Sequence, residues 1–165
     1  MQGSDQQAYD RGTTIFSPDG RLYQVEYARE AVGQGAPVVG VRGEDSVVLA
    51  AHAPDRSPLA ADGDTEKVAG VDDHVAVAGA GHAADTRQLV DLARRRAQQE
   101  RVRYGERVPV AELATVVADH LQEYTQTGGA RPYGTALLVA GHDGAPGLVE
   151  IDPSGATRSC RADAV

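Results

Sequence analysis

Residues Tyr9–Gly33 read YDRGTTIFSPDGRLYQVEYAREAVG: a polar lead, a short extended piece at 13–16, a tight turn and one amphipathic helix. In the turn Ser17–Gly20, proline presets φ at the second position, and aspartate and glycine accept the positions after it. From Arg21 the apolar residues recur every three or four positions, which places on one helical face Leu22, Val25, Ala28 and Val32. We expect Gly33 to end this helix in the left-handed conformation.

Composition sets the outer limits of the fold. The chain has 165 residues, enough for one domain, and with no tryptophan and a single phenylalanine its core must be valine, alanine and leucine. The formal net charge of −8 argues against a nucleic-acid surface, which needs clustered positive charge. No apolar run approaches the roughly 18 residues of a membrane-spanning helix. One cysteine, Cys160, excludes an internal disulfide and fits a cytoplasmic protein.

The remaining pattern alternates between strands and helices. Valine-rich runs predict one hairpin from 36–42 and 46–51 and a second from 66–71 and 74–78, with a polar loop over 54–64 between them. Helical periodicity follows over 83–103 and again from Pro109 to Gly128. Three strand segments then close the chain, at 136–141, 148–151 and 157–162. This order predicts an α+β domain with antiparallel hairpins and a helical pair on one face.

Catalytic and metal motifs are weak. Gly79–Ala84 fits a relaxed dinucleotide fingerprint, but it follows a hairpin and lacks the next strand with its acidic residue, so a tight strand-to-helix turn is the better interpretation. The five histidines have no metal-ligand spacing, and one cysteine does not complete a Cys/His site. We therefore expect no cofactor, no metal and no catalytic residue.

The whole N-terminal string, Y-D-R followed by S-P-D-G-R-L-Y-Q-V-E-Y-A, resembles the signature of proteasome α subunits, in particular the archaeal form. The resemblance continues in family order through GAPVVGVR (35–42), TEKV (65–68), AGHAADTRQL (80–89), RYGE (103–106), YTQTGGARPYG (124–134) and DPSG (152–155). The single lysine, Lys67, and the excess of aspartate add a hint of a halophilic or GC-rich source.

The resemblance implies a fold, the four-layer α-β-β-α sandwich of N-terminal-nucleophile hydrolases. Residues 1–8 would be a mobile gate, 9–34 the α-specific segment and helix, and 35–165 a partial sandwich of one domain. Family chains continue with a further strand and a second helical layer, so we expect that layer to be missing here.

The implied function is that of a non-catalytic member of a seven-membered α ring, in a threonine-type endopeptidase complex that degrades unfolded proteins with ATP. Its partners would be other α subunits, the β subunits and an activating ATPase, with no nucleic acid and no membrane. The resemblance assigns a gate cluster (Tyr9, Asp10, Arg11, Pro18 and Tyr27), an activator-docking pocket (Lys67, Gly81 and Arg29) and a pore loop (Thr127, Gly128 and Gly129).

Two alternatives stay open. An active N-terminal-nucleophile peptidase needs a threonine or serine opening the first core strand, yet that strand begins with Gly35–Pro37, and Thr13–Thr14 lies upstream of the helix. The other alternative is a truncated paralogue that regulates rings without joining them.

Overall fold

The computed structural model describes residues 15–52 and 67–165. The expected mobile gate at 1–8 and three members of the gate cluster, Tyr9, Asp10 and Arg11, lie outside these ranges, as does the expected loop at 54–64. The expectations for those segments stay predictions from the sequence.

Helices and strands follow one another largely as the periodicity predicts. In chain order they are α2 (Tyr23–Gly33), β1 (Val38–Arg42), β2 (Val47–Ala51), β3 (Val68–Asp72), β4 (Val75–Gly81), α3 (Ala83–Tyr104), α4 (Val110–Gln126), β5 (Thr135–His142), β6 (Pro146–Ile151), β7 (Thr157–Ser159) and β8 (Ala162–Ala164). None of the helices in the described ranges is long and apolar enough to span a membrane.

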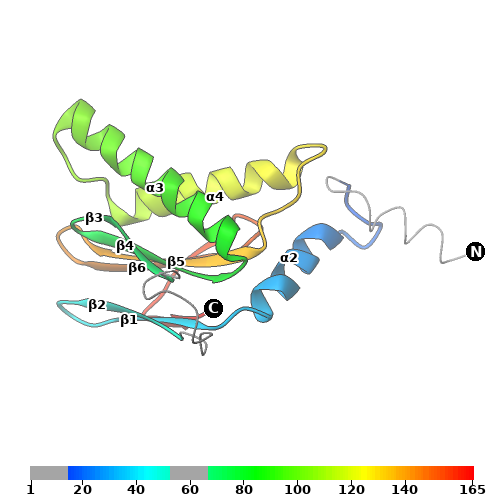
Figure 1. The fold of residues 1–165 in the computed structure, drawn as a ribbon, viewed down its shortest axis with the longest axis horizontal. Helices are drawn as coiled ribbons and strands as arrows, with labels where there is room; N and C mark the ends of the chain where they lie inside the picture. The colour runs from blue at the N-terminus through cyan, green and yellow to red at the C-terminus, as the bar shows by residue number, and fades with distance from the viewer. Residues whose placement is uncertain (1–14, 53–66) are drawn as a thin grey trace, which may run out of the picture.

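The strands form two stacked antiparallel sheets (Figure 1). One sheet has the order β2-β1-β8 and the other β3-β4-β5-β6-β7. Helices α3 and α4 cover the outer face of the five-stranded sheet, and α2 lies beside the sheets at one end (Figure 1). The α+β prediction is confirmed, and the three layers arise because each sheet buries one apolar face against a neighbour.

Two apolar clusters hold the layers together, and valine, alanine and leucine dominate both, as the composition predicts. The larger cluster lies between the five-stranded sheet and the helical pair and includes Leu89, Leu113 and Leu121. The smaller one lies between the sheets around Val38, Leu138 and Leu148. Each fully buried leucine contributes roughly 1.5–3 kcal/mol through removal of its side chain from water.

The end of α2 differs from the prediction. Gly33 lies inside the helix, and the capping residue is Gln34, with an ordinary right-handed φ of −85°. The Gln34 N–H donates to the Glu30 carbonyl, so the chain leaves the helix without a left-handed turn. Helix α3, by contrast, does end in a left-handed glycine: Gly105 has a φ of 71°, and its N–H donates to the Arg101 carbonyl.

The last predicted strand, 157–162, is in fact two strands in different sheets. β7 pairs with β6 in the five-stranded sheet, whereas β8 pairs with β1 in the other. Cys160 lies at the crossing, where its N–H still bonds to Leu148 and the next carbonyl, that of Arg161, already accepts from Arg42. Arg158 bridges the crossing by pairing with both Glu150 and Asp163 at 2.8 Å. A change of sheet within six residues leaves no periodic signal in the sequence.

The outer face of the three-stranded sheet is apolar and exposed. Val39, Val41 and Val48 are 42%, 49% and 60% exposed, a density of valine that an ordinary solvated sheet face does not carry. The strands alternate strictly, with Val38 and Gly40 turned to the core.

Leu121→Ala should lower the free energy of unfolding by about 2–5 kcal/mol, because Leu121 is fully buried between α4 and the sheet and its truncation leaves a cavity. Urea unfolding followed by circular dichroism measures the change. Val102→Ala, on the exposed side of α3, is the matched control and should stay within about 0.5 kcal/mol. Equal effects for the two variants would contradict the assigned core.

Candidate functional site

The turn before α2 is rigid because the chain bonds to itself on both sides. The Gly20 N–H donates to the Ser17 carbonyl at 2.8 Å, and Ser17 N–H donates to the Arg21 carbonyl at 2.9 Å. The Ser17 side chain is buried, and its Oγ accepts from the Arg21 N–H. Gly20 has a φ of 75°, which explains why glycine closes the turn. Pro18 therefore has a fixed position, and the expected turn is confirmed.

Helix α2 is tied to the turn between β6 and β7 by one ion pair. The Arg29 guanidinium donates to both carboxylate oxygens of Asp152, at 2.9 Å each, and Asp152 also accepts from the N–H and Oγ of Ser154. Burial alone would raise the pKa of Asp152, but Arg29 and Ser154 together hold it below its usual range. Tyr27, from the predicted gate cluster, lies half exposed on the same helix.

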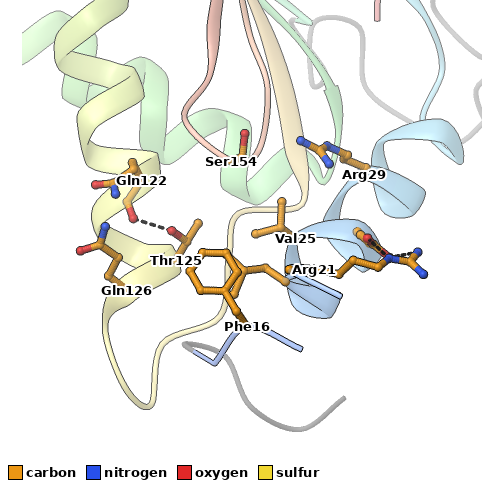
Figure 2. Close-up of a pocket in the computed structure, with 11 residues that line it drawn as sticks. Phe16, Arg21, Val25, Arg29, Gln122, Thr125, Gln126 and Ser154 are labelled. Carbon is orange, nitrogen blue, oxygen red and sulfur yellow. Dashed lines mark hydrogen bonds and ion pairs between the residues drawn. The ribbon is translucent and has the colours of Figure 1, made fainter. Parts of the chain in front are cut away.

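A cleft of about 640 Å³ separates this helix from the end of α4. Phe16 points into it, between Val25 of α2 and Thr125 of α4 (Figure 2), and its side chain is 64% exposed. Gln122 and Gln126 form the opposite wall. The cleft thus places the N-terminal turn opposite the helix that leads into the predicted pore loop.

Lys67 enters the five-stranded sheet at the start of β3, and its Nζ donates to the carbonyl oxygen of Ala36. Partial burial lowers the pKa of the amine, and no carboxylate among the described residues forms an ion pair with it. A partly buried ammonium whose described partner is one carbonyl can bind a carboxylate from another molecule.

Gly81 lies close to Lys67 in the fold because β3 and β4 are paired and both contact the connection after α2. Its φ is 108°, and a Cβ there would clash with the carbonyl oxygen of Gly134. A Cβ on Gly35 would clash with the Gly81 backbone nitrogen. The structure thus brings Lys67 and Gly81 to one region, whereas the described polar contacts of Arg29 are to Asp152.

The predicted pore loop follows α4. Thr127 caps the helix in extended conformation, its Oγ1 donates to the Glu123 carbonyl at 2.9 Å, and the Ala130 N–H donates to the Thr127 carbonyl. Gly129 has a φ of 86°, so a residue with a side chain would be strained there. Thr127, Gly128 and Gly129 are all exposed, so the tip of the loop is free to contact other molecules.

Sequence reasoning missed the anchor of this loop. Asp85, in the first turn of α3, is 4% exposed and accepts from both Nη atoms of Arg131 and from the Gly134 N–H. A buried aspartate at helical spacing is the signal that was available, since a buried charge requires a partner. Nothing in the sequence names that partner, which lies 46 residues away.

Cofactor and metal chemistry finds little support in the described residues. Gly79–Ala84 forms the expected tight turn from β4 into α3 within an antiparallel sheet. Asp72, Asp73 and His74 lie together, but Arg101 pairs with both carboxylates and the His74 Nε2 lies 2.8 Å from the Val108 carbonyl oxygen.

The second such cluster joins Glu150, Cys160 and Asp163. Arg158 forms an ion pair with each of its two carboxylates. Burial and the neighbouring Asp163 raise the pKa of the Cys160 thiol, which makes a thiolate ligand unfavourable.

Two stacked antiparallel sheets with a helical pair on one outer face fit the sandwich architecture of the N-terminal-nucleophile hydrolases. The chain belongs to the proteasome family: residues 32–165 match the family described as "Proteasome subunit", and residues 9–31 match the family described as the N-terminal signature of the proteasome A-type subunits.

Curated relatives are named as proteasome α subunits. The alpha 2 proteasome subunit of Haloarcula marismortui is 60% identical over 166 residues, which cover 100% of this chain and 68% of the relative. The alpha proteasome subunit of Haloquadratum walsbyi is 60% identical over 157 residues, which cover 94% of this chain and 63% of the relative. The alpha proteasome subunit of Halobacterium salinarum is 58% identical over 167 residues, which cover 100% of this chain and 66% of the relative. The chain therefore spans about two thirds of the length of these relatives, and the resemblance to archaeal α subunits is confirmed.

Asp152→Asn should reduce stability at pH 7 by about 0.5–1 kcal/mol, since the ion pair with Arg29 is partly exposed and screened. The folded-state pKa of Asp152 is depressed, so its contribution is complete above the ordinary value of 3.8 and is lost as pH falls through the lowered pKa. Urea unfolding from pH 7 to pH 3 should therefore bring the two proteins together at low pH.

Glu44→Gln is the control for that series, because Glu44 is exposed in the turn between β1 and β2 and forms no ion pair with another described residue, so this substitution should leave the pH profile of wild type unchanged. A gap between wild type and Asp152→Asn that stayed constant down to pH 3 would contradict the role of the carboxylate charge.

Proposed function

We propose that this chain is a non-catalytic member of a proteasome α ring, which forms the gated entrance to a proteolytic chamber and docks an activating ATPase. The observation that carries the proposal is the match of residues 9–31 to the α-type N-terminal signature. The names of the relatives support it. We place the protein in the cytoplasm, with unfolded proteins as the substrates of the assembled particle.

The residues before β1 support the proposed non-catalytic role. In an N-terminal-nucleophile enzyme this strand would open with a freed threonine whose own amine activates its hydroxyl. Here Gly35, Ala36 and Pro37 precede Val38, and the helix α2 ends directly before them. The rival, an active threonine peptidase cut at Thr13 or Thr14, predicts a shortened chain by intact mass. A full-length mass would exclude that processing.

The docking pocket is proposed at Lys67 and Gly81. The Lys67 ammonium is partly buried, and its described partner is a neutral carbonyl, so it can neutralise the C-terminal carboxylate of an activator tail. Arg29 is proposed at the margin of this region, where its ion pair with Asp152 fixes α2. The gate is proposed at Pro18 and Tyr27 with Tyr9, Asp10 and Arg11.

The pore constriction is proposed at Thr127–Gly129, which are exposed beyond the end of α4. We further propose that the described residues form three layers of the α-β-β-α sandwich. The exposed valines of β1 and β2 mark the face on which the fourth, helical layer would pack.

Self-association is the first test. The purified chain, of 17.3 kDa, should form a species of about seven copies by light scattering in both low and molar salt, as a closed ring requires. A monomer at both salt concentrations would contradict ring formation and would favour the alternative of a regulatory paralogue that does not assemble.

Lys67→Ala should abolish stimulation by an activating ATPase in particles reconstituted with β subunits, while hydrolysis of small peptides stays intact. Lys67→Arg is the matched control. It keeps the charge but replaces a compact ammonium by a planar guanidinium, so we expect partial stimulation. Full stimulation of the Lys67→Ala particles would refute the pocket assignment.

A further inference from the structure

One buried carboxylate holds the base of the loop 127–134. Asp85 Oδ2 accepts from Arg131 Nη1 at 2.7 Å and from the Gly134 N–H at 2.8 Å, and Asp85 Oδ1 accepts from Arg131 Nη2 at 2.8 Å. Arg131 Nη1 also donates to the carbonyl of Pro132. Three charge-assisted hydrogen bonds on a side chain that is 4% exposed form the strongest polar anchor of this loop among the described residues.

The same loop end touches the end of β4 largely through backbone atoms. The His82 N–H donates to the Gly134 carbonyl at 2.9 Å, and that oxygen occupies the space that a Cβ on Gly81 would need. A Cβ on Gly134 would in turn lie 2.9 Å from the His82 ring. Thr135 Oγ1, fully buried, donates to the Ala80 carbonyl. The junction has no room for a side chain at Gly81 or Gly134, so the two segments keep one relative position.

The loop tip has far fewer restraints than its base. Tyr133 is buried against the rings of Tyr124 and His120, with centroids at 4.9 and 5.8 Å. By contrast, the exposed tip is held by single hydrogen bonds at Thr127 and Ala130. The position of the tip is therefore set by how the base is fixed.

We infer that Asp85 is a positioning residue for the loop 127–134, and that it joins the loop to Gly81 so that the two move as one unit. This inference rests on the proposed function for the meaning of the two ends, the docking pocket at Gly81 and the pore loop at Thr127. Binding of a ligand in the pocket at Gly81 would then change the position of the pore loop at Thr127, through the start of α3 and the loop base.

Hydrogen exchange of the full chain, read by mass spectrometry, tests the anchor. Asp85→Asn should speed exchange of the amides in 130–134 (those of Ala130, Arg131, Tyr133 and Gly134) by at least about tenfold, since charge-assisted bonds are lost. Arg131→Gln, at a more exposed side chain, should do the same and serves if the first variant fails to fold. Asp152→Asn is the control, because it removes a different carboxylate–arginine pair and should leave 130–134 unchanged.

Unchanged exchange over 130–134 in Arg131→Gln would overturn the inference. So would acceleration spread evenly over α3 and β5, because that pattern indicates general loss of stability and no specific anchoring of the loop.

Substitution of Gly81 tests whether Gly81 and the loop 127–134 move as one unit. Gly81→Ala should accelerate exchange over the same amides, because its Cβ displaces the Gly134 carbonyl. Lys67→Ala should not, because the described hydrogen bond of the Lys67 side chain is to Ala36 and not to the loop. Acceleration confined to β4 in Gly81→Ala would overturn the joint movement.

The charge of Asp85 supplies a second readout. Burial alone would raise its pKa, but Arg131 and the Gly134 N–H, with the nearby His82, lower it below 3.8; Tyr133 is the other titratable group that faces it. The ratio of exchange rates between Asp85→Asn and wild type should be constant above pH 3.8 and shrink as pH falls through the lowered pKa. A loop held only by packing would show no such change.

These measurements use the chain itself and need neither a ring nor an activator. A chain that formed no rings would refute the proposed function while leaving the exchange result to be decided on its own. If the chain formed rings and their stimulation by the ATPase depended on Lys67, but hydrogen exchange over 130–134 did not change in Arg131→Gln, only the role of Asp85 would be refuted.

Discussion

The structure depends on one close contact between backbones. Where α2 ends, where β4 ends and where β5 begins, the chain places Gly35, Gly81 and Gly134 so close together that a Cβ on any of them would collide with a neighbour. Glycine is the residue that permits such contact and the positive φ at Gly81. The N-terminal helix, the five-stranded sheet and the loop after α4 are oriented relative to one another by this junction, and the apolar cores then fill the space on either side.

The parts of the fold that repeat could be predicted from the sequence, and the parts that depend on distant contacts could not. Periodicity placed α3 and α4, because buried apolar residues recur every four positions in each: Leu89, Ala93 and Ala97 in α3, and Leu113, Val117 and Leu121 in α4. Periodicity failed at Gly33, because the helix is capped one residue later, at Gln34, without a left-handed turn. It also failed at 157–162, because one predicted strand is two strands that pair in different sheets.

The candidate site shows the same division. Pro18 and the turn that holds it follow from local chemistry, and Lys67 was singled out by resemblance and then found with a neutral described partner. The pair of Asp85 with Arg131 joins segments 46 residues apart, and no local pattern could match them. A resemblance to a family places residues in order along the chain; side-chain pairing of this kind emerges only from three-dimensional contact.

The isolation of Lys67 has a consequence for chemistry carried out on the protein. It is the single lysine of the 165 residues, so its Nζ is the one side-chain amine that acylating or alkylating reagents can reach. Partial burial lowers its pKa and so enlarges the fraction in the nucleophilic, uncharged form. An isotopic or fluorescent group attached there would mark a single defined point beside the junction of Gly35 and Gly81, and its signal would report on whatever approaches that surface.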